Sequence, residues 1–221
     1  MNSTPAVAAF FDVDGTLTKT TVLHPLVWYQ QAHLPWWRFA LWMAALAVRV
    51  PGYVMLDRCN RAAFIHRFYA SYAGLPAAEV ERFHRQALAG TYAARLYPQA
   101  VAKLDWHRRQ EHRIILVSGG LDLVLQPLAE HLAADQLLCG RLEAQDGRFT
   151  GRLAGPPMIG SHKAQAMLQC PGIDFARSFA YADSISDLPM LQIVGHPAAI
   201  NPDARLRAVA QRQGWPIHRW R

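Results

Sequence analysis

The stretch "FFDVDGTLTKT", residues 10–20, constrains this chain more than any other feature. It places two acids, Asp12 and Asp14, directly after the apolar run 7–11. A short continuous apolar run is typical of a strand that is buried on both faces of a sheet. Two carboxylates this close repel each other, so a cation, a proton or hydrogen bonds must compensate. We therefore expect a buried strand that delivers acids to a polar site.

Short apolar runs alternate with amphipathic stretches through most of the chain. This pattern predicts an α/β fold with a Rossmann-like parallel sheet and helices on both of its faces. Segment 141–153 is expected to form a β-hairpin that turns at Asp146-Gly147. The strands are expected at 6–11, 113–117, 135–140, 178–182 and 198–200. The helices are expected at about 98–110, at 121–132 with a kink near Pro127, from about Ser161, after Ser186, and after Asn201-Pro202-Asp203.

The pattern changes between Val22 and roughly Gly90. This part shows no good strand, and its long apolar-periodic runs predict three or four helices. A change of composition inside a βα repeat indicates an insert. We therefore expect a catalytic core formed by residues 1–21 and 91–221, with a helical cap formed by residues 22–90.

The segment "LPWWRFALWMAALAVRVPGYVML", residues 34–56, is the most apolar part of the predicted cap. Pro51-Gly52 is expected to break it, and the uninterrupted apolar run 39–48 is too short to span a bilayer. Trp together with Arg is also typical of helices that lie in a membrane interface. Three alternatives stay open: a helical core of the cap, an oligomer interface, or contact of cap tryptophans, namely Trp36, Trp37 and Trp42, with a membrane surface.

Net charge and cysteine content narrow the partners. A formal charge of +7 favours anionic partners such as phosphate esters or anionic lipid head groups. The basic residues are scattered rather than clustered, so we expect no nucleic-acid partner. Three cysteines without a C-x-x-C pair argue against a disulfide framework or a structural zinc site. Together with an N-terminus that lacks a basic n-region, they predict a cytoplasmic protein, with peripheral contact to the inner membrane face as an alternative.

Polar residues follow the ends of successive predicted strands. Because the carboxyl ends of parallel strands meet at one edge of a sheet, we expect these side chains to converge. Carboxylates bind a hard cation such as Mg²⁺. A hydroxyl, glycine amides and a lysine supply hydrogen-bond donors for a phosphate. The residues concerned are Asp12, Asp14, Ser118, Gly119, Asp183 and Asp187, with Lys163 in the first turn of the helix that begins near Ser161.

These residues resemble the four motifs of the haloacid dehalogenase-like phosphatase superfamily. The matching segments are "FDVDGT", "LVSGG", the Lys of "GSHK", and "YADSISDLPML". The helical insert and the wording of the last motif are similar to the phosphoserine-phosphatase-like subgroup, subfamily IB. The resemblance implies a Mg²⁺-dependent hydrolase of phosphomonoesters that works through an aspartyl-phosphate.

The resemblance also implies a catalytic role for each matched residue. Asp12 would be the nucleophile that carries the phosphoryl group. Asp14 would protonate the leaving oxygen and later deprotonate the attacking water. Ser118 and the Gly119 amide would hold the phosphoryl oxygens, and Lys163 would neutralise charge between the phosphate and Asp12.

The metal ligands follow from the same resemblance. Mg²⁺ would be held by a carboxylate oxygen of Asp12, the backbone carbonyl of Asp14, and Asp183. Asp187 would act through water or through hydrogen bonds to these ligands.

The chain departs from the subgroup where substrate is selected. Members that hydrolyse phosphoserine usually carry a Glu that meets the substrate ammonium, and Thr21 stands in its place here. Lys19 adds positive charge nearby, and Arg58 is a further candidate in the cap. These residues favour a substrate that is anionic or partly apolar beyond its phosphate.

Several readings of the function therefore stay open. The substrate is expected to be a small phosphorylated metabolite or a phospholipid head group. The alternatives are a phosphoserine or histidinol-phosphate phosphatase and a lipid head-group phosphatase of the phosphatidylglycerophosphate type. A different class, a phosphoacceptor signalling domain, would use similar residues to switch a partner without turnover. The oligomeric state stays open.

Overall fold

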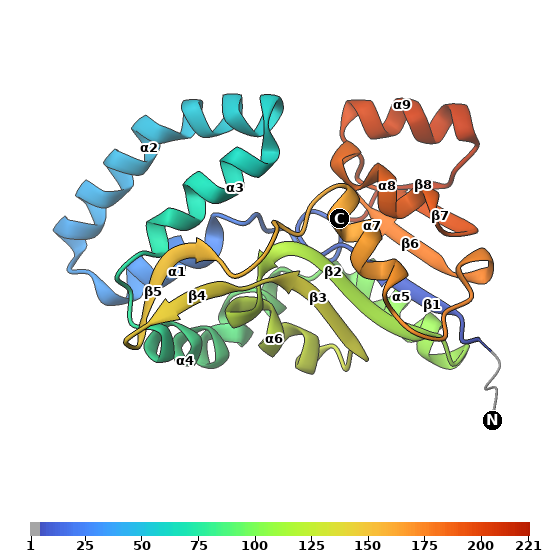
Figure 1. The fold of residues 1–221 in the computed structure, drawn as a ribbon, viewed down its shortest axis with the longest axis horizontal. Helices are drawn as coiled ribbons and strands as arrows, with labels where there is room; N and C mark the ends of the chain where they lie inside the picture. The colour runs from blue at the N-terminus through green and yellow to red at the C-terminus, as the bar shows by residue number, and fades with distance from the viewer. Residues whose placement is uncertain (1–4) are drawn as a thin grey trace.

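The computed structural model describes residues 5–221 and has at its centre a six-stranded sheet in the order β3-β2-β1-β6-β7-β8 (Figure 1). Every neighbouring pair of strands in this sheet is parallel. The predicted α/β fold with a Rossmann-like parallel sheet is confirmed. The strands are β1 (Ala8–Phe11), β2 (Arg113–Leu121), β3 (Gln136–Gly140), β6 (Phe179–Ala182), β7 (His196–Ile200) and β8 (Ile217–His218).

Helices cover both faces of the sheet because its central strand is apolar on both sides. Ala9 and Phe11 point into one hydrophobic cluster, and Ala8 and Phe10 point into the other. The first cluster includes side chains from α5 (Pro98–Arg109) and α6 (Asp122–His131). The second includes side chains from α7 (Ser161–Leu168), α8 (Leu188–Gln192) and α9 (Ala204–Gln213).

Two details of the sheet differ from the prediction. β2 does not end at Val117 but continues through Ser118 to Leu121, with a shift of its register against β3. The strand can pass close to the side chain of Leu125 because residue 120 is a glycine. A Cβ on Gly120 would lie 2.8 Å from a side-chain carbon of Leu125. β8 was not predicted, since two residues are too few to show an alternating pattern.

The predicted hairpin is formed by β4 (Leu142–Gln145) and β5 (Arg148–Leu153). Its two turn residues have positive φ angles, 50° at Asp146 and 73° at Gly147, as a type I′ turn requires. The hairpin also pairs with the cap. The Gly74 amide donates to the Phe149 carbonyl at 2.8 Å, and the Phe149 amide donates to the Leu75 carbonyl at 3.0 Å.

The segment between β1 and α5 is helical, as predicted. It contains four α-helices: α1 (His24–His33), α2 (Trp36–Cys59), α3 (Arg61–Tyr69) and α4 (Ala77–Ala87). Short 3₁₀ turns follow, namely η1 (Ala70–Tyr72), η2 (Leu88–Gly90) and η3 (Ala93–Arg95). The cap boundaries at residues 22 and 90 stay a prediction.

The expectation that Pro51-Gly52 breaks the helix is wrong, because α2 runs through Pro51 to Cys59. Proline removes one backbone hydrogen bond, here to the carbonyl of Ala47, but both residues are exposed and water can bind that carbonyl. By length and composition, this 24-residue helix could cross a membrane, and its mean hydropathy reaches 1.6. The helix is therefore longer than predicted, while its uninterrupted apolar run remains 39–48.

A buried histidine joins the first hydrophobic cluster to the sheet. His107 on α5 is fully buried, and its Nε2 lies 2.9 Å from the hydroxyl of Tyr181 on β6. Its Nδ1 lies 2.8 Å from Nδ1 of His112. Burial, followed by the nearby His112 and Lys103, lowers the pKa of His107 to about 3. The imidazole is therefore neutral in the folded protein at neutral pH.

We expect His107 to make stability depend on pH. Its folded pKa lies below the ordinary unfolded value of 6.5, so its contribution is fully present above pH 6.5 and is lost as the pH falls. Lowering the pH from 7 to 5 should cost about 2 kcal/mol of unfolding free energy at this residue. Urea unfolding at both pH values measures the change. His107→Gln should flatten the pH dependence, and exposed His131→Gln should not; equal slopes in all three proteins would contradict the assignment.

Candidate active site

Asp12 lies at the carboxyl edge of the sheet, one residue after β1. Its backbone amide donates to the Tyr181 carbonyl on β6 at 3.0 Å, which continues the pairing of the two strands and holds Asp12 in place. Its buried carboxylate accepts a hydrogen bond from Thr16 Oγ1 at 3.1 Å on one oxygen. The other oxygen accepts from Lys163 Nζ at 2.7 Å. The predicted nucleophile is therefore fixed at both oxygens.

Lys163 bridges two acids from different parts of the chain. It lies in the first turn of α7, is 3% exposed, and forms ion pairs with Asp12 Oδ1 at 2.7 Å and Asp187 Oδ1 at 2.9 Å. Burial alone would lower the pKa of Lys163, but the two carboxylates outweigh it and raise that pKa above its ordinary value. A lysine opposes the helix dipole at this position. The two carboxylates compensate for it.

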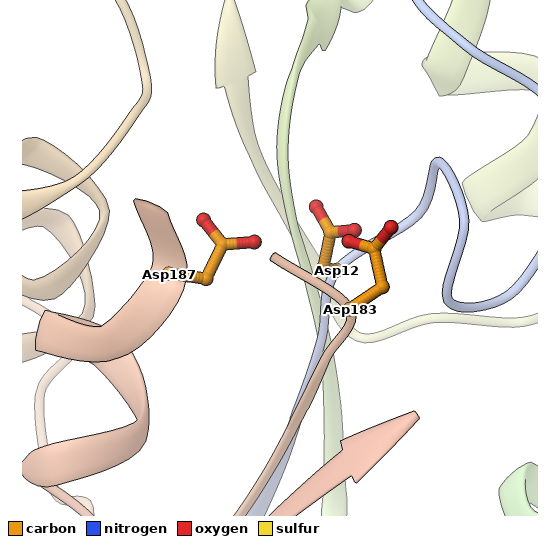
Figure 2. A group of neighbouring side chains, drawn as sticks. All are labelled: Asp12, Asp183 and Asp187. Atoms are coloured by element: carbon orange, nitrogen blue, oxygen red, sulfur yellow. The ribbon is translucent and has the colours of Figure 1, made fainter. Parts of the chain in front are cut away.

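Asp12 and Asp187 form an acid cluster with a third carboxylate, that of Asp183 (Figure 2). One oxygen from each of Asp12, Asp183 and Asp187 lies within 4.8 Å of the others. Burial raises the pKa of Asp12 to about 6 despite Lys163. Burial and the two neighbouring acids raise the pKa of Asp183 to about 8. Hard oxygen donors whose charges are incompletely balanced are a suitable site for a divalent cation such as Mg²⁺.

Asp187 belongs to this cluster, at the sheet edge where the sequence placed it. Its carboxylate forms an ion pair with Lys163, and one of its oxygens lies within 4.8 Å of oxygens of Asp12 and Asp183. Asp187 therefore joins Asp12 and Asp183 as a residue that could hold a cation. Its expected action through water or through hydrogen bonds to the metal ligands stays a prediction.

Gly15 makes room for one of these carboxylates. Its φ of +82° lies in the left-handed region that favours glycine, and a Cβ there would lie 2.1 Å from Asp183 Oδ2. No side chain larger than hydrogen fits without moving Asp183. The Gly of "DVDGT" therefore contributes to the acid cluster by leaving space for the Asp183 carboxylate.

Asp14 faces the cavity with an unpaired oxygen. Its Oδ1 accepts a hydrogen bond from Thr20 Oγ1, while its Oδ2 is buried and has no hydrogen-bond partner. Burial raises the pKa of Asp14 against the hydrogen bond from Thr20. A carboxyl group of this kind can hold a proton and give it to a bound group. The contact of Thr20 with Asp14 was not predicted. The sequence feature that could have indicated it is the alternation of Thr18 and Thr20 after Leu17.

Ser118 and Gly119 lie on β2 opposite Asp12 and line the same cavity. The Ser118 hydroxyl oxygen accepts a hydrogen bond from the Gly120 amide at 3.0 Å, which leaves the hydroxyl hydrogen available to a bound anion. The Gly119 carbonyl accepts from the Tyr69 hydroxyl of the cap at 2.7 Å. The expected phosphate donors therefore converge with the acids, and the roles of Ser118 and the Gly119 amide stay predictions.

The acids and donors open into a cavity of about 570 Å³, a size suited to a small ligand. Its cap side is mainly apolar, with three charged residues, two near the end of α2 and one at the start of α3. The apolar residues are Val22, Leu23, Val50, Tyr53, Val54, Phe64 and Ile65, and the charged ones are Asp57, Arg58 and Arg61.

The predicted selectivity residues are only partly in this cavity. Thr21 and Arg58 line it, as expected. The placement of Lys19 was wrong, because the Lys19 amide donates to the Arg95 carbonyl and its ammonium lies 5.3 Å from the centre of the Tyr97 ring. Lys19 is not among the lining residues.

The charged residues that line the cavity include Asp57 and Arg61, which were not among the predicted site residues, but not Lys19. Arg61 Nη1, at the start of α3, lies 3.4 Å from Asp57 Oδ1, near the end of α2. The Arg61 Nε is buried and has no hydrogen-bond partner.

Comparisons with known proteins agree with this geometry. The haloacid dehalogenase-like hydrolase family matches residues 9–192. The chain belongs to this family. It is 33% identical over 226 residues to the "Inhibition of morphological differentiation protein" of Streptomyces azureus, covering 98% of this chain and 79% of that one. It is 37% identical over 138 residues to the phosphoserine phosphatase SerB1 of Mycobacterium tuberculosis, covering 57% of this chain and 45% of that one.

Solved structures share the fold of this hydrolase. A Bordetella pertussis protein of unknown function superposes with a TM-score of 0.81 at 25% identity, covering 97% of this chain and 99% of that one. A phosphoserine phosphatase in its phospho-aspartyl intermediate analogue form has a TM-score of 0.70 at 18% identity, covering 97% and 93%. The predicted membership among phosphoserine-phosphatase-like members of the family, and the prediction of a phosphomonoester hydrolase, are confirmed.

We expect Gly15→Ala to weaken cation binding specifically. The new Cβ would collide with Asp183 and push one carboxylate out of the acid cluster. Isothermal titration with Mg²⁺ should show a loss of about tenfold or more in affinity, the scale found when groups that orient metal ligands are removed. Gly147→Ala is the matched control, because Gly147 also has a positive φ but its Cβ would meet nothing within 4 Å. Unchanged Mg²⁺ binding by Gly15→Ala would contradict this role.

Proposed function

We propose that this phosphatase hydrolyses phosphomonoesters whose leaving group combines an apolar part with a second negative charge. One observation carries the proposal: the acid and lysine cluster opens into a cavity whose cap wall is aliphatic and aromatic and bears two arginines and one acid. The acid and lysine cluster suits the phosphoryl group of the ester, and the cap wall suits its leaving group.

The chemistry begins at Asp12. Its carboxylate oxygen attacks phosphorus, and the bond from phosphorus to the ester oxygen breaks to leave an aspartyl-phosphate. Asp14, through its unpaired buried oxygen, gives its proton to the departing alkoxide. Asp14 then takes a proton from water, which attacks the phosphorus and releases inorganic phosphate and free Asp12.

The remaining residues of the cluster manage charge. Lys163 lies against Asp12 and reduces the repulsion between that carboxylate and an anionic phosphate. Asp12, Asp183 and Asp187 would hold Mg²⁺, with the backbone carbonyl of Asp14 as a further predicted ligand. When bound, the ion would neutralise the phosphate and polarise its phosphorus. The family is generally Mg²⁺-dependent, which supports this assignment.

The cap wall supports an anionic rather than an ammonium-bearing leaving group. Asp57 contributes one negative charge, and Arg58 and Arg61 contribute two positive charges, so these three sum to +1. Asp57 is also paired with Arg61, and Thr21 offers no charge. Two other acids of the cap, Glu79 and Glu81, are not among the lining residues.

Relatives named phosphoserine phosphatase and, in Neisseria meningitidis, histidinol-phosphatase support a small phosphorylated metabolite as the substrate class. Both of those substrates carry an amino group, which would meet the net positive wall. A head group with a second phosphate, as in the phosphatidylglycerophosphate type, fits the wall better. A cytoplasmic location stays a prediction.

A phosphoacceptor signalling domain fits the cavity less well. Such a domain has no need for a substrate-sized chamber between its aspartate and a separate helical layer. Steady-state release of phosphate from a panel of esters distinguishes the two functions. Many turnovers per protein molecule are expected, and a single stoichiometric phosphorylation would favour the signalling domain.

We expect substitutions of Asp12 and Asp14 to have different effects on turnover. Asp12→Asn should abolish turnover, because an amide is a poor nucleophile. Asp14→Asn should retain Mg²⁺ binding but lower kcat by about 10²–10⁴-fold, the usual contribution of a general acid. Phosphate release and Mg²⁺ titration measure the two effects. Asp105→Asn, an exposed acid paired with Arg108, is the control, and near-normal turnover by Asp12→Asn would exclude the covalent mechanism.

We expect Arg61→Ala to act on one class of substrate. For an ester with a second anionic group, such as short-chain phosphatidylglycerophosphate, loss of a charge-assisted hydrogen bond should lower kcat/KM by about 10–100-fold. Hydrolysis of p-nitrophenyl phosphate, which lacks that group, should change little. Arg67→Ala, on the same helix but outside the cavity, is the control. Equal losses on both substrates would assign Arg61 a structural role instead.

A further inference from the structure

α2 exposes a large apolar surface. Of its 24 residues only Tyr53 is buried. Figure 1 shows the helix at the outer edge of the cap. Its large apolar side chains are exposed to unusual extents: 82% for Trp36, 81% for Val48, 70% for Met55 and 65% for Leu41. Burying such side chains against a partner would be strongly favourable.

Four of the exposed apolar side chains share one face of the helix. Trp37, Leu41, Val48 and Met55 are separated by four, seven and seven residues, a spacing that keeps them in one row. Ala44 lies within the same row. The opposite row packs inward, since Trp42, Leu46 and Leu56 contact the first hydrophobic cluster. Of the alternatives left open for the cap tryptophans, packing in the core of the cap therefore applies to Trp42.

Another helix of the cap shows what a water-facing surface looks like in this protein. α4 buries Val80 and His84 and exposes charged residues on its other side, among them Glu81, Arg82 and Arg85. α2 has no acid before Asp57. Its outer face is therefore unlike that of α4 and unlike an ordinary solvated helix.

The only charged residues of α2 before Asp57 are two arginines. Arg38 and Arg49 are eleven residues apart, about three helical turns, so they lie on the same side of the helix. Both are exposed, and the Arg38 guanidinium lies 5.0 Å from the centre of the Trp37 ring. An apolar row bordered by arginines and tryptophans complements a layer of anionic head groups above acyl chains.

We propose that α2 docks on an anionic lipid surface. The row formed by Trp37, Leu41, Val48 and Met55 lies in the interface, and Arg38 and Arg49 contact the head groups. The helix lies on the membrane rather than across it. Its inner row packs on the cap, where Tyr53 contacts the rings of Phe64 and Phe68, and crossing a bilayer would break these contacts.

The docking surface is continuous with the catalytic cavity. Val50, Tyr53, Val54 and Arg58, all on α2, line that cavity from the cap side. A membrane against the outer face of α2 therefore lies one helix diameter from the substrate chamber. This places a lipid-borne phosphate close to Asp12; that step rests on the proposed function, whereas the docking itself does not.

Co-sedimentation with vesicles tests the docking. We expect the wild-type protein to sediment with vesicles of phosphatidylcholine and phosphatidylglycerol and much less with phosphatidylcholine alone. The double variant Leu41→Glu/Val48→Glu should lower partitioning by about tenfold or more, because charged groups are unfavourable in the interface. Arg38→Gln and Arg49→Gln should each lower it by about fivefold. Leu168→Glu, a 56% exposed leucine on α7, is the matched control.

Other outcomes would overturn the proposal. Failure to sediment with the anionic vesicles would do so, as would equal partitioning of wild type and the double variant. A wild-type dimer in light scattering that Leu41→Glu/Val48→Glu dissociates would instead assign this face to a second copy of the chain. Resistance to extraction with alkaline carbonate would indicate a spanning helix.

The test is independent of catalysis. The Asp12→Asn protein, which should not turn over substrate, should sediment as the wild type does. If it binds vesicles while the wild type releases no phosphate from any ester, the proposed function fails and the docking stands. If the wild type hydrolyses soluble esters but does not bind vesicles, the docking fails and the proposed function stands.

Discussion

The buried ion pairs of Lys163 are the interaction on which the site depends. A buried ammonium is strongly unfavourable unless charged partners lie against it. Here the partners are Asp12, after the first strand, and Asp187, beside the short helix α8, so one side chain joins segments from both ends of the chain. Loss of Lys163 would leave two buried carboxylates without a cationic partner.

Lys163 does not balance the whole cluster. Three ionised carboxylates and one ammonium sum to −2, which is the charge that a divalent cation neutralises. Without such a cation the cluster favours protons, as the raised pKa values of Asp12 and Asp183 show. Gly15 is also required for this arrangement, because a side chain at residue 15 would collide with Asp183 and keep it out of the cluster. The electrostatics of this edge and its shape therefore both suit the cation site that we propose beside the phosphate.

The two sides of α2 have different surroundings. The inner row of α2 packs on the cap core and lines the cavity, while the outer row is apolar and unpartnered within residues 5–221. The hairpin of β4 and β5 hydrogen-bonds to the cap at residues 74–75, so the cap is attached to the core at a point other than its two ends. The proposed substrate selection by Arg58 and Arg61 and the proposed docking of α2 thus belong to adjoining surfaces.

The order of strands and acids was readable from the sequence, because it rests on local patterns. A run such as "AAFF" is apolar on both sides of the strand and demands helices on both faces, and acids placed after strand ends must meet at one edge. Asp12, Asp14, Ser118, Lys163 and Asp183 were found in this way. Tertiary structure alone decided the rest. It turned Lys19 toward Tyr97, paired Asp187 with Lys163 and placed Arg61 of α3 beside Asp57 of α2. It also carried α2 through Pro51 and sent Trp42 inward, since those outcomes depend on which surface each side chain meets and not on the residues beside it in the chain.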